Sequence, residues 1–190
     1  MNPHQDILDF WFGDGNDDAR RHRELWFAGS PDVDAMIRER FLPQVELAAA
    51  GKRDHWKNEA GSCLALILLL DQFPLNIFRN QARGYLLGDQ ALPIAQHLLD
   101  QGHDRHYTPR QRLFAYLPFE HSESLPHQEL ALQLFAAMKG ESGMDSAYDY
   151  ALRHWEIVKR FGRFPHRNDA LGRISTPEEI EFLKQPGSRF

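Results

Sequence analysis

Three short segments of the chain combine charged side chains with aromatic residues and proline, a mixture typical of binding and catalytic sites. The first segment, residues 70–79, directly follows the most apolar stretch, so its polar side chains should emerge from the core. Those side chains are Asp71, Gln72, Asn76 and Arg79. Because buried polar groups must be paired, they either cap one another internally or contact a ligand.

The second segment, residues 116–123, supplies side chains that transfer protons or ligate metals. They are Glu120, His121 and Glu123. Pro118 and Pro126 flank them, which predicts little helix here and places the three side chains at a corner between helices. The alternative is a polar cluster that only fixes this corner.

The third segment, residues 159–168, is basic and contains Arg160, Arg163, His166 and Arg167, with Arg173 just beyond. Residues 151–175 hold six bases and two acids, although the whole chain has a formal charge of −5. Clustered arginines bind carboxylate or phosphate groups through bidentate hydrogen bonds. They can equally pair with the acids of the other two segments, and a network that leaves one face open would satisfy both interpretations.

Other site chemistries lack their sequence patterns. No His-Glu-x-x-His or Cys-x-x-Cys spacing is present, so we expect no metal site. No glycine-rich phosphate loop is present either, and we expect no cofactor. Ser122 lies beside His121 without a Gly-x-Ser-x-Gly turn, and Cys63 falls in an apolar stretch, where it is expected to be a small core residue.

These observations favour a pocket that binds a small anionic ligand, and they leave open whether acid–base catalysis follows binding. The candidate catalytic residues are Asp71, Glu120 and His121. The candidate ligand-binding residues are Gln72, Asn76, Arg79, Glu123, Arg160, Arg163, His166 and Arg167. Two alternatives stay open: a peptide- or protein-binding scaffold with an open groove, and a purely structural polar network.

The elements that must position these residues are helices. Leucine and alanine are abundant, β-branched residues are scarce, and no stretch alternates apolar and polar residues, so the chain is predicted to be all-α. Proline, Ser, Thr and Gly at helix ends predict about eight helices, plus a short piece at 20–27. The main helices are expected at 3–12, 31–50, 58–73, 89–100, from 109, 125–138, 144–161 and 177–183. Short loops between them indicate antiparallel helix pairs.

Composition limits the remaining possibilities. No linker divides residues 1–190, so one domain is expected. The acidic balance argues against nucleic-acid binding, and the longest apolar run, residues 64–70, is too short for a membrane span of about 20 residues. No signal peptide is visible, and the lone cysteine fits a reducing compartment, so a cytoplasmic protein is expected. The oligomeric state is not predicted.

Taken together, the motifs resemble those of a bacterial family, the domain-of-unknown-function family nine hundred and twenty-four. The matching stretches are ILDFWFG at 7–13, LLDQFPLNIFR at 69–79, FEHSE at 119–123, RFGRFPHRN at 160–168 and LGRISTPEE at 171–179. The resemblance implies a tetratricopeptide-repeat-like fold, a right-handed superhelix of helix pairs, and no established activity. Leu75 departs from it, because the family pattern usually has arginine there.

Overall fold

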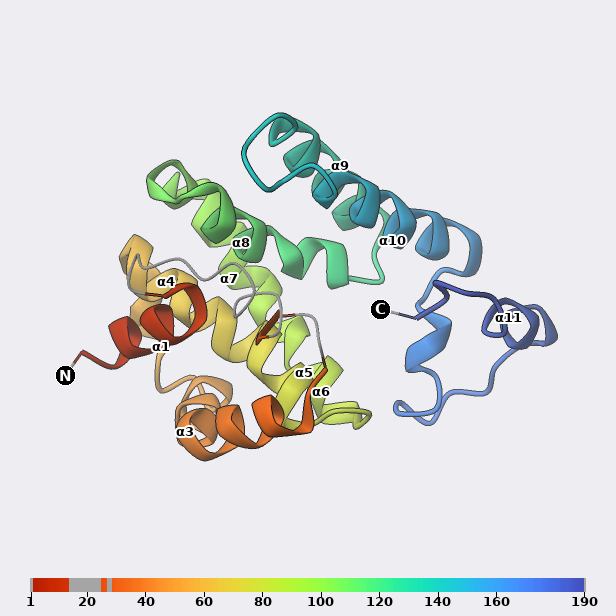
Figure 1. Ribbon diagram of the computed structural model, residues 1–190, viewed down its shortest axis with the longest axis horizontal. Coiled ribbons are helices and arrows are strands. Elements are labelled where there is room, and N and C mark those ends of the chain that lie inside the picture. Colours follow the sequence, from red (N-terminus) through yellow and green to blue (C-terminus); the bar gives the residue numbers. More distant parts are fainter. Residues whose placement is uncertain (1, 14–24, 27–28, 190) are drawn as a thin grey trace.

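The computed structural model describes residues 2–13, 25–26 and 29–189, and within these residues every regular element is helical (Figure 1). Helices α1 (Pro3–Phe12) and α3 (Pro31–Ala49) each begin at a proline, whose fixed φ suits the first helical turn. Neither Asn2 nor Ser30 caps its helix through a side-chain hydrogen bond. Proline alone therefore marks these two helix starts.

The central helix carries the first polar segment. It consists of α4 (Ala60–Ile67), a π-helical turn η2 (Leu68–Gln72) and α5 (Phe73–Ile77), which follow one another without a break. The π turn ends two residues before Pro74. A proline cannot donate to the carbonyl four residues earlier and its ring crowds that carbonyl, and the wider π turn accommodates both effects.

The same central stretch, Ala60–Ile77, has the length and mean hydropathy of a membrane-crossing helix, but 78% of it is buried inside the protein. Its apolar side chains are thus covered by other helices. The aromatic rings of Trp11 and Phe41 pack against Phe73 of this stretch, with ring centroids 5.3 and 4.9 Å from that of Phe73. This cluster forms the main hydrophobic core.

The remaining helices build the walls around this core. Two of them, α8 and α11, begin with a complete capping box, at Thr108 with Gln111 and at Thr176 with Glu179. Packing contacts connect α7 to α8, α8 to α9, and α9 to α10. The helices are α6 (Ala82–Leu86), α7 (Gly88–Asp100), α8 (Pro109–His121), α9 (Leu125–Ala137), α10 (Ala147–Phe161) and α11 (Pro177–Phe182), and the short 3₁₀ turns are η1 (Asp54–Asn58), η3 (His103–His106) and η4 (Pro165–Arg167).

The chain leaves the helical bundle after α10, and residues 162–189 form a C-terminal arm that includes α11 (Figure 1). Gly162 ends α10 in the left-handed region at φ 68°, which a glycine adopts without strain. Ile157, Val158 and Phe164 form a small second apolar cluster with Phe182 of α11. This arm carries the third polar segment back toward the end of α8.

The all-α fold with about eight helices is confirmed, and each of the eight main helices predicted from the sequence is present. The short helix expected at 20–27 falls largely outside the described residues. The expectation of little helix around Pro118 was wrong, because α8 runs through Pro118 to His121. The sequence did not predict α6 or the π turn, and the tetratricopeptide-like superhelix stays a prediction.

Candidate functional site

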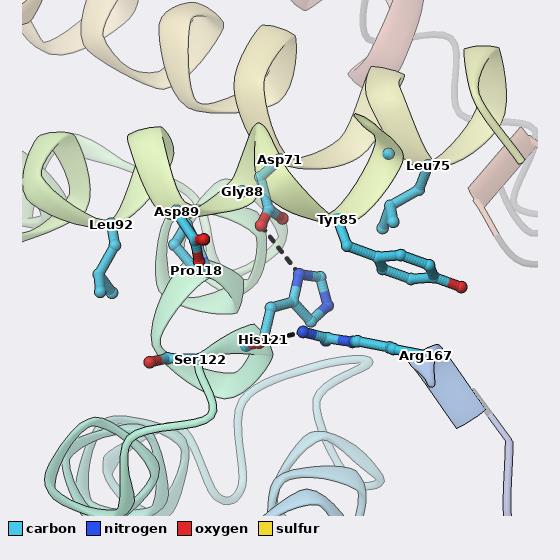
Figure 2. A pocket seen from close by; sticks show the side chains of 11 residues that line it. Asp71, Leu75, Tyr85, Gly88, Asp89, Leu92, Pro118, His121, Ser122 and Arg167 are labelled. Carbon is cyan, nitrogen blue, oxygen red and sulfur yellow. Dashed lines mark hydrogen bonds and ion pairs between the residues drawn. The ribbon is translucent and has the colours of Figure 1, made fainter. Parts of the chain in front are cut away.

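A pocket lies where the end of α8, the central helix and the C-terminal arm meet (Figure 2). Its cavity volume is about 20 Å³, enough for roughly one ordered water molecule. All three polar segments contribute to its walls, as does the start of α7. The lining residues are Asp71, Leu75, Gly84, Tyr85, Gly88, Asp89, Leu92, Pro118, His121, Ser122 and Arg167.

Asp71 enters the pocket from the π turn of the central helix. Its side chain is 1% exposed, so its two carboxylate oxygens need partners within the protein. Oδ1 lies 2.9 Å from His121 Nδ1, and Oδ2 accepts a hydrogen bond of 2.5 Å from the amide of Gln72. Asp71 and Gln72, two of the four candidate residues of the first segment, are therefore joined by a direct hydrogen bond.

His121 is the last residue of α8, and its ring lies between Asp71 and Arg167. Since Nδ1 faces Asp71, the second ring nitrogen points toward the space beside Tyr85 and Arg167 (Figure 2). Burial alone would lower the pKa of His121, but the Asp71 carboxylate outweighs burial and raises this pKa above its ordinary value. The pair thus resembles the carboxylate–histidine arrangement that orients a general base.

Glu120, the neighbour of His121, points into a second buried pair rather than into the pocket. His154 Nδ1 lies 3.1 Å from Glu120 Oε1 and 2.8 Å from the carbonyl oxygen of Tyr150. Burial raises the pKa of Glu120 to about 7 and lowers the pKa of His154 to about 3. The His154 and His121 rings are 6.3 Å apart, so the second pair lies directly behind the first.

Arg167 crosses the pocket from the C-terminal arm. Its guanidinium packs against the rings of Phe164 and Tyr85, at 4.3 and 5.2 Å from their centroids. Nη1 donates to the carbonyl oxygen of His121 at 2.9 Å, whereas the buried Nε has no hydrogen-bond partner among the described residues. Burial lowers the pKa of Arg167. The adjacent His166 ring also packs against Phe164, and burial lowers its pKa to about 3.

Glu123 does not face the pocket but fastens the arm to α8 and α9. Its oxygens accept two hydrogen bonds from Arg173, at 2.7 and 2.9 Å, and one from the backbone N–H of Phe164 at 2.8 Å. Burial would raise the pKa of Glu123, but these donors lower it. Because Phe164 precedes η4, this clamp positions Arg167.

Asn76 and Arg79 lie elsewhere, despite coming from the first segment. Both bond to Asp34 of α3: Arg79 donates twice, at 2.6 and 2.7 Å, and Asn76 once, at 2.9 Å. They line a separate surface groove between α3 and the end of α5, with a volume of about 320 Å³. The turn from residue 71 to residue 79 carries them to another face.

Arg160 and Arg163 are likewise not brought to the pocket. Arg163 donates to both oxygens of Glu179, at 2.6 and 2.8 Å, and to the carbonyl oxygen of Ile174. Arg163 lowers the pKa of Glu179 to about 2. Arg160 pairs with Glu178 on the surface, where both side chains are about half exposed. Their guanidinium groups hold α11 in place.

The expected direct pairing of Asp71 or Glu120 with an arginine is not seen among the described residues, because both carboxylates face histidines instead. The three segments nevertheless converge through Asp71, His121 and Arg167. Within residues 2–13, 25–26 and 29–189, no group of three or more His, Cys, Asp or Glu side chains is arranged to hold a metal ion.

The sequence did not point to Tyr85, Asp89 or His154. Tyr85 and Asp89 flank the short turn between α6 and α7, which carries no motif, and His154 lies within the regular pattern of α10. Partial burial raises the pKa of Asp89, and the charge of Arg167 opposes this shift. Acidic residues are common in the first turn of a helix, so the sequence alone does not mark Asp89 as a site residue.

Comparisons with known proteins identify relatives of the chain, and none of these relatives has an assigned activity. The family described as "Bacterial protein of unknown function (DUF924)" matches residues 7–187. A solved structure of a protein of unknown function from Agrobacterium tumefaciens is similar, with 38% identity and a TM-score of 0.85, over 96% of this chain and 97% of that one. No curated protein matches the chain significantly.

Proposed function

Since the chain belongs to a bacterial family of unknown function, DUF924, whose description assigns no activity, we propose a function from the pocket itself. The pocket binds the anionic group of a small molecule at Arg167 and places it beside His121, which transfers a proton. The observation that carries this proposal is the state of Arg167: a buried guanidinium that bonds only a backbone carbonyl.

Arg167 differs in this respect from the other arginines of its segment. Arg160, Arg163 and Arg173 each donate two hydrogen bonds to a carboxylate, whereas no ion pair engages Arg167 within residues 2–13, 25–26 and 29–189. The charges of Glu123 and Asp71 act on Arg167 without an ion-pair contact, and a buried cation that no carboxylate contacts is costly. A ligand carboxylate or phosphate would place a negative charge against the guanidinium, and its oxygens would accept hydrogen bonds from the guanidinium N–H groups.

The His121–Asp71 pair supplies the chemistry next to the bound anion. Asp71 fixes the ring through Nδ1, stabilises its protonated form, and leaves the second nitrogen toward the cavity. The cavity has room for about one water molecule, and His121 and Arg167 both line it. His121 can therefore take a proton from that water or from the ligand, which is general base catalysis.

The proposal is tested by adding acetate, inorganic phosphate or sulfate to the protein and following the ring signals of His121 by NMR. At least one anion should shift these signals in a saturable manner. Arg167→Gln should abolish the response, and Arg167→Lys should weaken it at least tenfold, because lysine lacks the planar fork.

Arg160→Lys is the matched control, since Arg160 lies in the same segment but pairs with Glu178 on the surface. This variant should respond like the parent protein. The proposal is overturned if none of the three anions perturbs His121, or if Arg167→Gln leaves the response intact.

A further inference from the structure

A second carboxylate, that of Asp89, lies in the same pocket as Arg167. Asp89 lines the pocket from the first turn of α7, and within the described residues no hydrogen bond or ion pair engages it. Figure 2 shows Asp89 beside Pro118, to the left of the His121 ring, and the end of the Arg167 side chain directly below that ring. An acid at this place needs an explanation, because it opposes the binding of a plain anion.

Three charged side chains line the cavity beside His121: Asp71, Asp89 and Arg167. Both oxygens of the Asp71 carboxylate are already engaged, one by His121 and the other by Gln72. What remains for a ligand is one cation, Arg167, and one anion, Asp89. A simple anion gains at Arg167 but is repelled by Asp89.

From this arrangement we propose that the ligand is a small zwitterion, with its carboxylate or phosphate at Arg167 and an ammonium group at Asp89. The inference rests on the proposed function, since it takes Arg167 as the anion contact. The interior of the pocket is narrow, so only the anionic end of such a molecule enters it. The ammonium then lies at the edge, where Asp89 is exposed.

The test compares pairs of ligands that differ only in a terminal ammonium group. They are acetate and glycine, propionate and β-alanine, butyrate and γ-aminobutyrate, and the corresponding pairs with five and six carbons. Binding is followed through the ring signals of His121 near neutral pH. At one chain length or more, the amino acid should bind about fivefold tighter than its plain acid, the size of a partly exposed ion pair.

Asp89→Asn should remove this preference and leave plain acids bound equally well or better. Asp100→Asn is the matched control on the same helix, because Asp100 bonds to Gln96 on the surface, and it should keep the preference. The comparison within the parent protein needs no variant, so a folding defect in Asp89→Asn cannot obscure the result.

Two results would overturn the inference while the proposed function stands: plain acids bind but no amino acid binds better, or the preference survives in Asp89→Asn. If neither series binds, Arg167 is not an anion contact, and both proposals fail. The outcomes therefore separate the nature of the ligand from the existence of the site.

Discussion

His121 Nδ1 and Asp71 Oδ1 are 2.9 Å apart although fifty residues of sequence separate them. Asp71 is the main group that raises the pKa of His121 against the effect of burial, and Glu120 adds a smaller contribution. Asp71→Asn should therefore lower the pKa of His121 below its ordinary value of about 6.5. Titration of the His121 ring signals by NMR measures this directly.

The same pair has a consequence for stability. A histidine whose pKa is raised by folding adds stability that is fully present below about pH 6.5 and is lost as the pH rises through the higher, folded value. The parent protein should lose this contribution, and Asp71→Asn should not show the loss. Asp6→Asn, which removes an exposed partner of Arg40, is the control. An unchanged His121 pKa in Asp71→Asn would show that the carboxylate does not govern the ring.

Because its pKa is raised, Glu120 should make the stability of the protein depend on pH in the opposite direction to most carboxylates. Its pKa is raised to about 7, so the folded protein binds this proton more tightly than the unfolded chain. The resulting stability is present at low pH and is lost as the pH rises from about 4.5 through about 7. Glu120→Gln keeps a neutral group at every pH. Relative to the parent, it should gain stability over this range, by about 3 kcal/mol at most.

Urea unfolding of both proteins between about pH 5 and about pH 8 tests this expectation. The lowered pKa of His154, which costs stability as the pH falls below about 6.5, is present in both proteins and largely cancels in the comparison. Glu129→Gln, on the exposed side of α9, is the control. A stability difference that does not change with pH would contradict the buried, protonatable state of Glu120.

Arg163 should matter for stability rather than for ligand binding. Arg163→Lys replaces a planar fork that bonds both oxygens of Glu179 with a single point charge, and should cost about 1–2 kcal/mol. Arg160→Lys should cost less than about 0.5 kcal/mol, because its pair with Glu178 is exposed. Thermal unfolding of the two variants gives the comparison. Equal effects would mean that the buried partner of Arg163 makes no difference.

Gly84 allows α6 to approach the end of α5 beside the pocket. A Cβ at this position would lie 3.0 Å from the carbonyl oxygen of Phe78 and 3.2 Å from that of Pro74. Because both are backbone atoms, Gly84→Ala should force the helices apart and cost about 1–3 kcal/mol. Gly61→Ala is the control, since its Cβ would meet only the Leu8 side chain at 3.9 Å. Denaturant unfolding should show Gly61→Ala neutral or stabilised and Gly84→Ala destabilised, and the reverse order would contradict the close approach.

A chelator should leave the unfolding midpoint unchanged. The described residues contain no cluster of metal-ligating side chains, and a large apolar core stabilises the fold. Thermal scans with and without EDTA check this. A marked loss of stability with EDTA would indicate a structural metal.

Local signals in the sequence predicted the fold because most helix ends are built from adjacent residues. The capping boxes at Thr108 and Thr176 each connect residues three positions apart, so they can be recognised without tertiary information. Pro118 misled for the opposite reason. A proline disfavours helix locally, but Pro118 is buried, and packing around it keeps the helix intact through His121.

The site could be predicted only as far as the convergence of its segments. Asp71, His121 and Arg167 belong to recognisable polar–aromatic motifs, and they do meet. Which arginine stays without a carboxylate depends on partners that lie far along the chain, such as Asp34 for Arg79 and Glu179 for Arg163. Pairing at such distances is decided by tertiary packing, which no local pattern encodes.

The π turn at residues 68–72 makes the central helix unequally tolerant of changes in length. A π turn holds one residue more than an α turn, so deleting one residue here would restore regular winding and leave the helix beyond it nearly in register. Inserting one residue would instead rotate everything beyond it by about 100°. Phe73 and Ile77 would then leave the core, and the fold would lose two buried side chains at once.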